Sequence, residues 1–278
     1  MNNIKKIGNL KVISKNNKKI CIKKINNYID REKYLKSKGF QNILHSEVLD
    51  GYVVRDFIDE VSISKEDKLH ELVYLICLLH TKTTHYKNLT IDNIKDFYED
   101  ETNKIIELKK YYESIFDRCI YKFLPPSIYL LIKNMSLILK SLDESKKYLD
   151  KWYEIVKDKK RKRVVLNHNN LKANNLIVGE SMYLINWDKS MVDYPIYDVL
   201  SLFRCNYKET DMFDLFNIYN AKYGLLPEEY YLLISKLLRV DFLIFNHNEV
   251  ENCRNAYELV YYLKVVNSFL NDNMEKKK

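Results

Sequence analysis

Hydrophobic and polar residues alternate in short, β-branched runs through the first 60 residues. Runs with this period of two predict strands, and three of them stand out: Asn9–Ser14, Lys19–Ile25 and Gly51–Phe57. The polar pair Asn16-Asn17 separates the first two runs and predicts a hairpin turn. The start of the chain is therefore expected to form a small sheet.

A helix is expected between these strands. The segment Asp30–Lys38 has a helical pattern, and Gly39 follows it at the position where glycine commonly ends a helix. A short strand near Ile43–Val48 is expected next. The predicted order is strand, strand, helix, short strand and strand.

From residue 62 onward the hydrophobic period becomes helical. Ser64 is a suitable N-cap for a helix whose apolar stripe contains Leu69, Leu72, Val73, Ile76 and Leu79. Further helices are expected at Ile91–Phe116, at Ser127–Ser141, at Asp143–Lys157, and from Tyr197 to about Leu270.

A strand-rich island interrupts the helical part. Short strands are expected at Val164–Leu166, Leu176–Val178 and Tyr183–Asn186, with a turn at Gly179-Glu180. The pattern predicts an α+β fold with a small β-rich lobe, residues 1–59, and a larger helical lobe, residues 60–278. The helical lobe would contain a hairpin at residues 164–188, and a ligand cleft is expected between the lobes.

Composition narrows the class of protein. The net charge of +8 favours anionic partners, but no nucleic-acid-binding motif accompanies it. The cysteines are odd in number and scattered, which argues against a disulfide framework and a zinc site; they are Cys21, Cys77, Cys119, Cys205 and Cys253. No run of apolar residues resembles a signal peptide or a transmembrane helix, so a cytoplasmic location is expected.

Three motifs in the strand-rich island and just after it carry a resemblance. His168–Asn175 reads HNNLKANN and resembles the catalytic loop H-G-D-x-x-x-x-N, while Leu184–Asp188 reads LINWD and resembles the metal-binding stretch L-I-D-W-D. Asp193–Val199 reads DYPIYDV and resembles D-P-x-Y-D-L. In this order and spacing the motifs are similar to those of aminoglycoside phosphotransferases and choline kinases. The pair Leu79-His80 extends the resemblance upstream.

The resemblance implies a two-lobed protein kinase-like fold and phosphoryl transfer from ATP, which depends on positioning and on charge neutralisation. In such a site a carboxylate accepts the proton of the substrate hydroxyl, but this chain has Asn170 there. The position of the principal metal ligand is Asn186, while Asn175 and Asp188 keep the expected residue types. His168 and Asp198 are expected to support the loop. Asp188 is either a second metal ligand or an exposed acid.

Both replacements exchange a carboxylate for its neutral isostere. Loss of a general base costs roughly 10²–10⁴-fold in rate, and Mg²⁺ prefers anionic oxygen ligands. Binding of ATP and Mg²⁺ is therefore expected to be weakened.

The N-terminal strands contain the remaining candidate residues. The segment Cys21–Lys24 resembles the V-A-I-K strand of kinases, so Lys23, or failing that Lys24, is expected to hold phosphate and to pair with Glu32. The alternative is that both lysines are solvated on an edge strand. The adenine-binding hinge is expected at Val54, Asp56 and Ile58. The first hairpin has one glycine, Gly8, and so lacks a glycine-rich phosphate loop.

These observations favour a catalytically impaired kinase-like protein, a pseudokinase, with a binding or scaffold role. The chain also resembles kinase-like spore-coat proteins of endospore-forming bacteria, which would imply a protein partner and a place in the spore coat. The alternatives are an active ATP- and Mg²⁺-dependent phosphotransferase that acts on a small-molecule hydroxyl, and a nucleotide-binding regulator. The expected ligand is a nucleotide or a small molecule. Acceptor specificity would lie in Ile91–Lys157, where no signature identifies the substrate.

Overall fold

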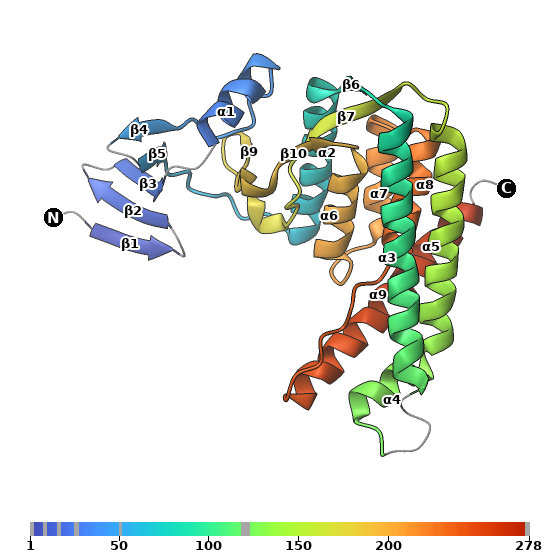
Figure 1. The fold of residues 1–278 in the computed structure, drawn as a ribbon. Coiled ribbons are helices and arrows are strands. Elements are labelled where there is room, and N and C mark those ends of the chain that lie inside the picture. Colours follow the sequence, from blue (N-terminus) through green and yellow to red (C-terminus); the bar gives the residue numbers. More distant parts are fainter. Residues whose placement is uncertain are drawn as a thin grey trace. The chain divides into compact units, whose positions relative to one another are not determined.

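A computed structural model gives the fold of this chain (Figure 1). It describes residues 3–7, 10–15, 18–24, 28–49, 52–117 and 123–275. The side chains of residues 1–29, 49, 53 and 273–278 lie outside this description.

The N-terminal strands form a five-stranded antiparallel sheet in the order β1-β2-β3-β5-β4. The strands are β1 (Asn3–Ile7), β2 (Leu10–Lys15), β3 (Lys18–Lys24), β4 (Glu47–Leu49) and β5 (Tyr52–Asp56). The three predicted long strands are confirmed as β2, β3 and β5. The first strand was not predicted, because its sequence NIKKI does not alternate strictly. The predicted turn at Asn16-Asn17 lies outside the described residues.

Strand β3 lies in the middle of this sheet, between β2 and β5. Its register pairs Cys21 with Arg55 and Lys23 with Val53. The edge position that the alternative gave to Lys23 and Lys24 is wrong, because β3 pairs with β2 on one side and with β5 on the other. Solvation of the two side chains stays a prediction, since they lie outside the described residues.

Helix α1 (Tyr28–Ser37) connects β3 to β4. Gly39 follows it at φ +74°, a left-handed conformation that glycine adopts without strain, as its position in the sequence predicted. The amide of Phe40 then donates to the carbonyl of Leu35. Both side chains are fully buried, so this turn anchors α1 in the core.

Helix α2 (Lys65–Thr83) has the predicted N-cap, since the Ser64 hydroxyl accepts a hydrogen bond from the amide of Asp67 at 3.0 Å.

The strand-rich island consists of β7 (Arg161–Asn167), β8 (Leu176–Val178), β9 (Met182–Leu184) and β10 (Met191–Asp193). Strands β8 and β9 form a hairpin. A separate sheet has the order β10-β7-β6, where β6 is His85–Asn88. Helix α6 (Ile196–Asn206) follows.

The chain divides into two compact units. Unit 1 contains Met1–His85, Arg163–Asn206 and Leu215–Gly224, and unit 2 contains Tyr86–Lys162, Tyr207–Asp214 and Leu225–Lys278. All site residues expected from the sequence belong to unit 1. The predicted boundary between the lobes, after residue 59, stays a prediction.

Unit 2 is built from helices, of which α5 packs against α3 and α8, while α4 packs against α9. The helices are α3 (Ile91–Asp117), α4 (Pro126–Lys133), α5 (Met135–Val156), α8 (Pro227–Leu238) and α9 (Glu249–Glu275). Helix α7 (Met212–Lys222) contributes residues to both units.

The predicted break between Ser127–Ser141 and Asp143–Lys157 is wrong. The helices separate at Asn134, whose side chain caps α4 by donating to the carbonyl of Leu130 at 2.8 Å. Helix α5 continues through residue 142, because Leu142 is fully buried in its packing face.

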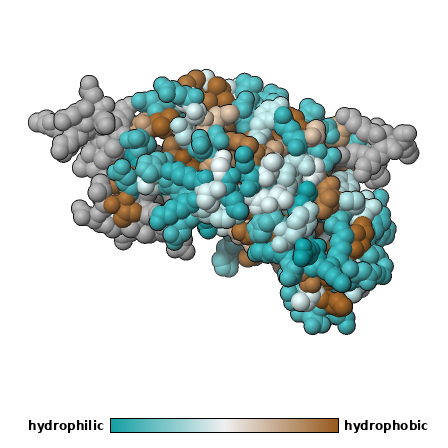
Figure 2. All heavy atoms as spheres, turned by 90° about the horizontal axis from the view of Figure 1, so that it is seen from above, coloured by the Kyte–Doolittle hydropathy of each residue, from teal (hydrophilic) through white to brown (hydrophobic). Residues whose placement is uncertain are grey.

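Figure 2 shows one face of the molecule, where hydrophilic residues predominate and hydrophobic residues form small separate groups. Within the described residues, no helix combines the length and the hydropathy needed to cross a membrane.

Candidate functional site

The loop between β7 and β8 is anchored by Asp198, which lies in the first turn of α6 and is fully buried. Its Oδ2 atom accepts a hydrogen bond from the amide of His168 at 2.8 Å, and Oδ1 accepts one from the amide of Asn169 at 2.6 Å. Because both oxygens bond to consecutive backbone amides, the carboxylate determines the course of the loop at this point.

A second contact holds Asp198 from helix α2. The Nε2 atom of His80 lies 3.0 Å from Asp198 Oδ2, and its Nδ1 atom lies 2.8 Å from the hydroxyl of Tyr219. His80 is fully buried. Its place in the pair Leu79-His80 contributed to the family resemblance but indicated no function for it. The structure adds it to the groups that hold the loop.

The His168 ring joins the loop to the segment after β9. Its Nε2 atom lies 2.8 Å from the carbonyl of Ile185, and its ring packs edge-on against Trp187 with centroids 4.6 Å apart. Burial lowers the pKa of His168, so the ring is neutral at pH 7. A carbonyl can only accept, so Nε2 carries the proton. These contacts give His168 a supporting position.

Asn170 is the residue that the motif predicts at the position of the proton acceptor. The preceding residue, Asn169, has φ +57°, and its side chain donates to the carbonyl of Lys189 at 3.2 Å. The Asn170 side chain is half-buried, and among the described residues it has no hydrogen-bond partner. A neutral amide can bond to a ligand there, but it cannot take up a proton from a hydroxyl.

An amide chain connects Asn170, Asn175 and Asn186. The Nδ2 atom of Asn175 donates to the backbone carbonyl of Asn170 at 2.6 Å, and the Nδ2 atom of Asn186 donates to Asn175 Oδ1 at 2.8 Å. Asn186 has φ +63° and precedes a short 3₁₀ turn, Trp187–Lys189. The structure therefore brings together three of the residues that the motifs indicated.

Asp188 is exposed and lies near Arg31 of helix α1. Burial lowers the pKa of the Arg31 guanidinium, and the charge of Asp188 opposes that shift. The Nη1 atom of Arg31 also donates to the carbonyl of Trp187. Arg31 could not be identified from the sequence, because nothing in its local pattern indicates a partner more than 150 residues away.

This donor set fits a divalent cation poorly. Asn175 Oδ1 already accepts a hydrogen bond from Asn186, and Asp188 is the one carboxylate among the three predicted metal ligands. No cluster of three or more histidine, cysteine, aspartate or glutamate side chains with metal-binding geometry occurs among the described residues. Magnesium prefers anionic oxygens, so no chemical step is assigned to a metal here.

Glu32 lies on α1 and is buried, but its observed partners differ from the expected one. Its Oε1 atom accepts hydrogen bonds from Lys36 at 2.8 Å and from the amide of Ser46 at 3.3 Å, and it lies 3.0 Å from His45 Nδ1. Burial alone would raise the pKa of Glu32, but these hydrogen bonds lower it below its ordinary value. Pairing with Lys23 stays a prediction, because the side chain of Lys23 lies outside the described part of the chain.

The predicted hinge residues differ in their surroundings. Val54 lies inside β5 and pairs with both β3 and β4, so its backbone groups face neighbouring strands. Asp56 ends β5 beyond the described register of β4, and Ile58 follows in the connection to α2. Contact with adenine stays a prediction for all three and suits Asp56 and Ile58 better.

The connection after β5 packs on the β8–β9 hairpin. The amide of Val61 donates to the carbonyl of Val178 at 2.8 Å. At Gly179, an added Cβ would come within 2.7 Å of Ile58 Cγ2. A side chain at this position would force a shift of Ile58, so glycine allows the connection after β5 to pack closely on the hairpin.

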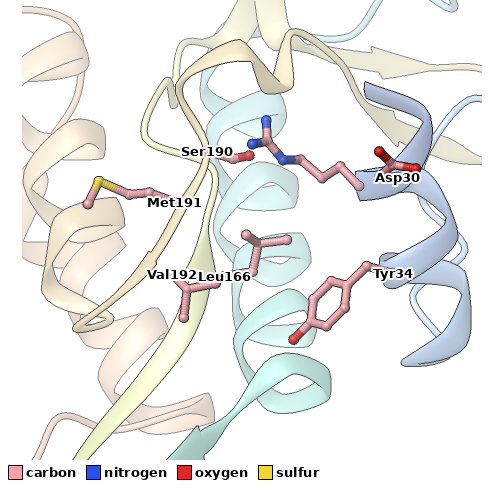
Figure 3. A pocket seen from close by; sticks show the side chains of 7 residues that line it. Asp30, Tyr34, Leu166, Ser190, Met191 and Val192 are labelled. Atoms are coloured by element: carbon pink, nitrogen blue, oxygen red, sulfur yellow. The ribbon is translucent and has the colours of Figure 1, made fainter. Parts of the chain in front are cut away.

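A pocket of about 500 Å³ lies between α1 and β10 (Figure 3). Tyr34 projects from α1 on one side, and Ser190 and Val192 lie on the other. The hydroxyl of Ser190 is buried and has no hydrogen-bond partner among the described residues. None of the site residues predicted from the sequence lines this pocket.

Comparison with known proteins gives one result for the sequence and another for the fold. No protein-family model matches the sequence, and no curated protein matches it. Solved structures do match. An aminoglycoside phosphotransferase from Alicyclobacillus acidocaldarius has a TM-score of 0.67 at 12% identity, covering 97% of this chain and 92% of that chain.

Two further matches have comparable coverage. Spectinomycin phosphotransferase APH(9)-Ia, in complex with ADP and spectinomycin, has a TM-score of 0.54 at 14% identity over 96% of this chain and 92% of that chain. Choline kinase LicA from Streptococcus pneumoniae has a TM-score of 0.52 at 15% identity over 96% and 94%. The chain therefore has the α+β, protein kinase-like fold of the aminoglycoside phosphotransferases and choline kinases.

Proposed function

We propose that this protein is a pseudokinase that uses its kinase-like site to bind a ligand and does not transfer phosphate. The observation that carries the proposal is the neutral amide of Asn170 on a loop that several side-chain hydrogen bonds support. His168, Asp198 and His80 hold the loop through buried hydrogen bonds. The scaffold for catalysis is retained while the proton acceptor is absent.

The proposed ligand is a nucleotide or another small molecule. Spectinomycin phosphotransferase, which shares the fold, was solved with ADP and with AMP. The proposed location is the cytoplasm, in line with the scattered cysteines; the alternative is the spore coat with a protein partner, in line with the spore-coat resemblance. The alternative is an active phosphotransferase, and the retained carboxylate of Asp188 is the feature that favours it.

Two measurements test the proposal. Calorimetric titration with ATP, with and without Mg²⁺, measures binding, and release of ADP in the presence of choline, aminoglycosides or sugars measures turnover. We expect binding without turnover above background. Turnover that Asp188→Asn abolishes would establish the alternative function instead.

A matched pair of variants locates the nucleotide. Lys23→Ala should weaken ATP binding more than Lys24→Ala, because Lys23 is the residue expected to hold phosphate and neighbouring residues of a strand alternate between the two faces of a sheet. Equal effects of the two substitutions would remove Lys23 from the site.

A further inference from the structure

We infer that the protein replaces the divalent cation of its kinase-like site with two contacts of its own, an amide chain and the Arg31 guanidinium, so that it binds its ligand without a metal ion. The part concerning the ligand rests on the proposed function. The part concerning the metal can be tested on the protein alone.

The direction of the amide chain is determined by its first link. The Asn170 backbone carbonyl can only accept, so the 2.6 Å contact turns Nδ2 of Asn175 toward it and Oδ1 of Asn175 toward Asn186. Asn186 must then donate, which it does through Nδ2 at 2.8 Å. The orientation of both side-chain amides follows from the hydrogen bonds alone.

An aspartate at position 186 could not make this contact. An ionised carboxylate has no proton to donate, so its oxygen would face Asn175 Oδ1 without a hydrogen between them. A cation bound by both oxygens would relieve that repulsion. Asn186 closes the same gap directly, with a hydrogen bond in place of a shared metal ion.

The remaining carboxylate has a positive charge beside it. Arg31 is held to the 3₁₀ turn by its hydrogen bond to the Trp187 carbonyl, next to Asp188 in the chain. A second cation at Asp188 would be repelled by the guanidinium. The amide chain involves Asn175 and Asn186, and the Arg31 guanidinium lies beside Asp188. Together the two contacts affect all three predicted metal ligands.

The test compares Asn186→Asp with Asn174→Asp. Asn174 is exposed in the neighbouring turn, so its substitution adds the same charge without touching the amide chain. In EDTA, Asn186→Asp should lower the Tm by about 3 °C, and millimolar MgCl₂ or MnCl₂ should restore it. Wild type and Asn174→Asp should show no change in Tm on addition of either metal.

Two results would overturn the inference: a metal-dependent rise in the Tm of wild type as large as that of Asn186→Asp, or no rescue of Asn186→Asp by either metal. If Asn186→Asp does not fold, titration of wild type with MnCl₂, followed by electron paramagnetic resonance of unbound Mn²⁺, decides the question. Stoichiometric binding of Mn²⁺ to wild type would then refute the inference.

ATP serves as the ligand probe. Its Kd for wild type should be the same in EDTA and in MgCl₂ within about twofold, and binding at least about tenfold tighter with Mg²⁺, equivalent to about 1.4 kcal/mol, would contradict metal-free binding. If ATP does not bind under either condition, the nucleotide part of the proposed function fails. The metal titrations on ligand-free protein still decide the replacement of the cation.

Discussion

Replacement of Asp198 by asparagine should loosen the loop that carries Asn170. The carboxylate accepts hydrogen bonds from the amides of His168 and Asn169, and it contacts His80 Nε2. Hydrogen bonds to a charged group contribute about 1.5–3 kcal/mol each, and a buried donor left unpaired costs about 1–3 kcal/mol. Asparagine keeps one acceptor oxygen and turns an NH₂ group toward the other donors, so at least one buried donor loses its acceptor.

The expected loss in the free energy of unfolding is about 3 kcal/mol, which is the lower end of the range for removing one partner of a buried charged contact. At about 2–4 °C per kcal/mol for a protein of this size, the Tm should fall by about 6–12 °C. Urea unfolding and a thermal scan measure these two quantities. Asp158→Asn is the control, since Asp158 is exposed.

Hydrogen exchange shows whether the effect is local to the loop. The amides of His168 and Asn169 should exchange faster in Asp198→Asn than in the control, because they lose the acceptor that protects them. The reasoning is refuted if the variant is within about 0.5 kcal/mol of the control, the usual range of surface substitutions, or if those two amides stay protected.

Three further predictions concern other parts of the chain. Gly179→Ala should destabilise the protein by about 1–3 kcal/mol through overpacking against Ile58, and the effects of Gly179→Ala and Ile58→Ala on urea unfolding should be non-additive; additive effects would exclude the contact. Glu101→Ala should lower the free energy of unfolding by about 3–5 kcal/mol, because Glu101 is the acidic partner of the buried Lys236 and of Arg239. Thermal unfolding measures the effect against the exposed control Glu99→Ala, and equal Tm values for the two variants would contradict the prediction. Burial lowers the pKa of His168, so below about pH 6.5 the unfolded chain takes up a proton that the folded protein does not. The free energy of unfolding should therefore fall as the pH drops, by at most about 1.4 kcal/mol per pH unit. Urea unfolding between about pH 7.5 and about pH 5.5 measures this slope, and the same slope in His168→Gln would show that His168 does not cause it.

Much of the fold followed from local sequence. Strands β2 and β3, the N-cap at Ser64 and the left-handed Gly39 each depend on neighbours within a few residues, so their patterns were sufficient. The motif spacing placed Asn170, Asn175 and Asn186 in one kinase-like loop region, and their hydrogen-bonded chain is consistent with that placement.

Helix boundaries inside unit 2 were less predictable. The sequence near residue 142 and the sequence at Asn134 both allow a break. Packing decides between them, because Leu142 must lie in the buried face of α5 while the Asn134 side chain is able to cap α4.

Partners distant in sequence were decided by the tertiary structure alone. Glu32, by contrast, has partners close in sequence, since its Oε1 atom contacts Lys36, His45 and Ser46, which lie 4 to 14 residues away. Arg31 reaches Trp187 because β9 and the turn after it return to α1, and His80 reaches Asp198 because α2 and α6 meet in one core. Local patterns encode strands, helices and caps, whereas contacts between side chains more than a hundred residues apart exist only after the chain has packed.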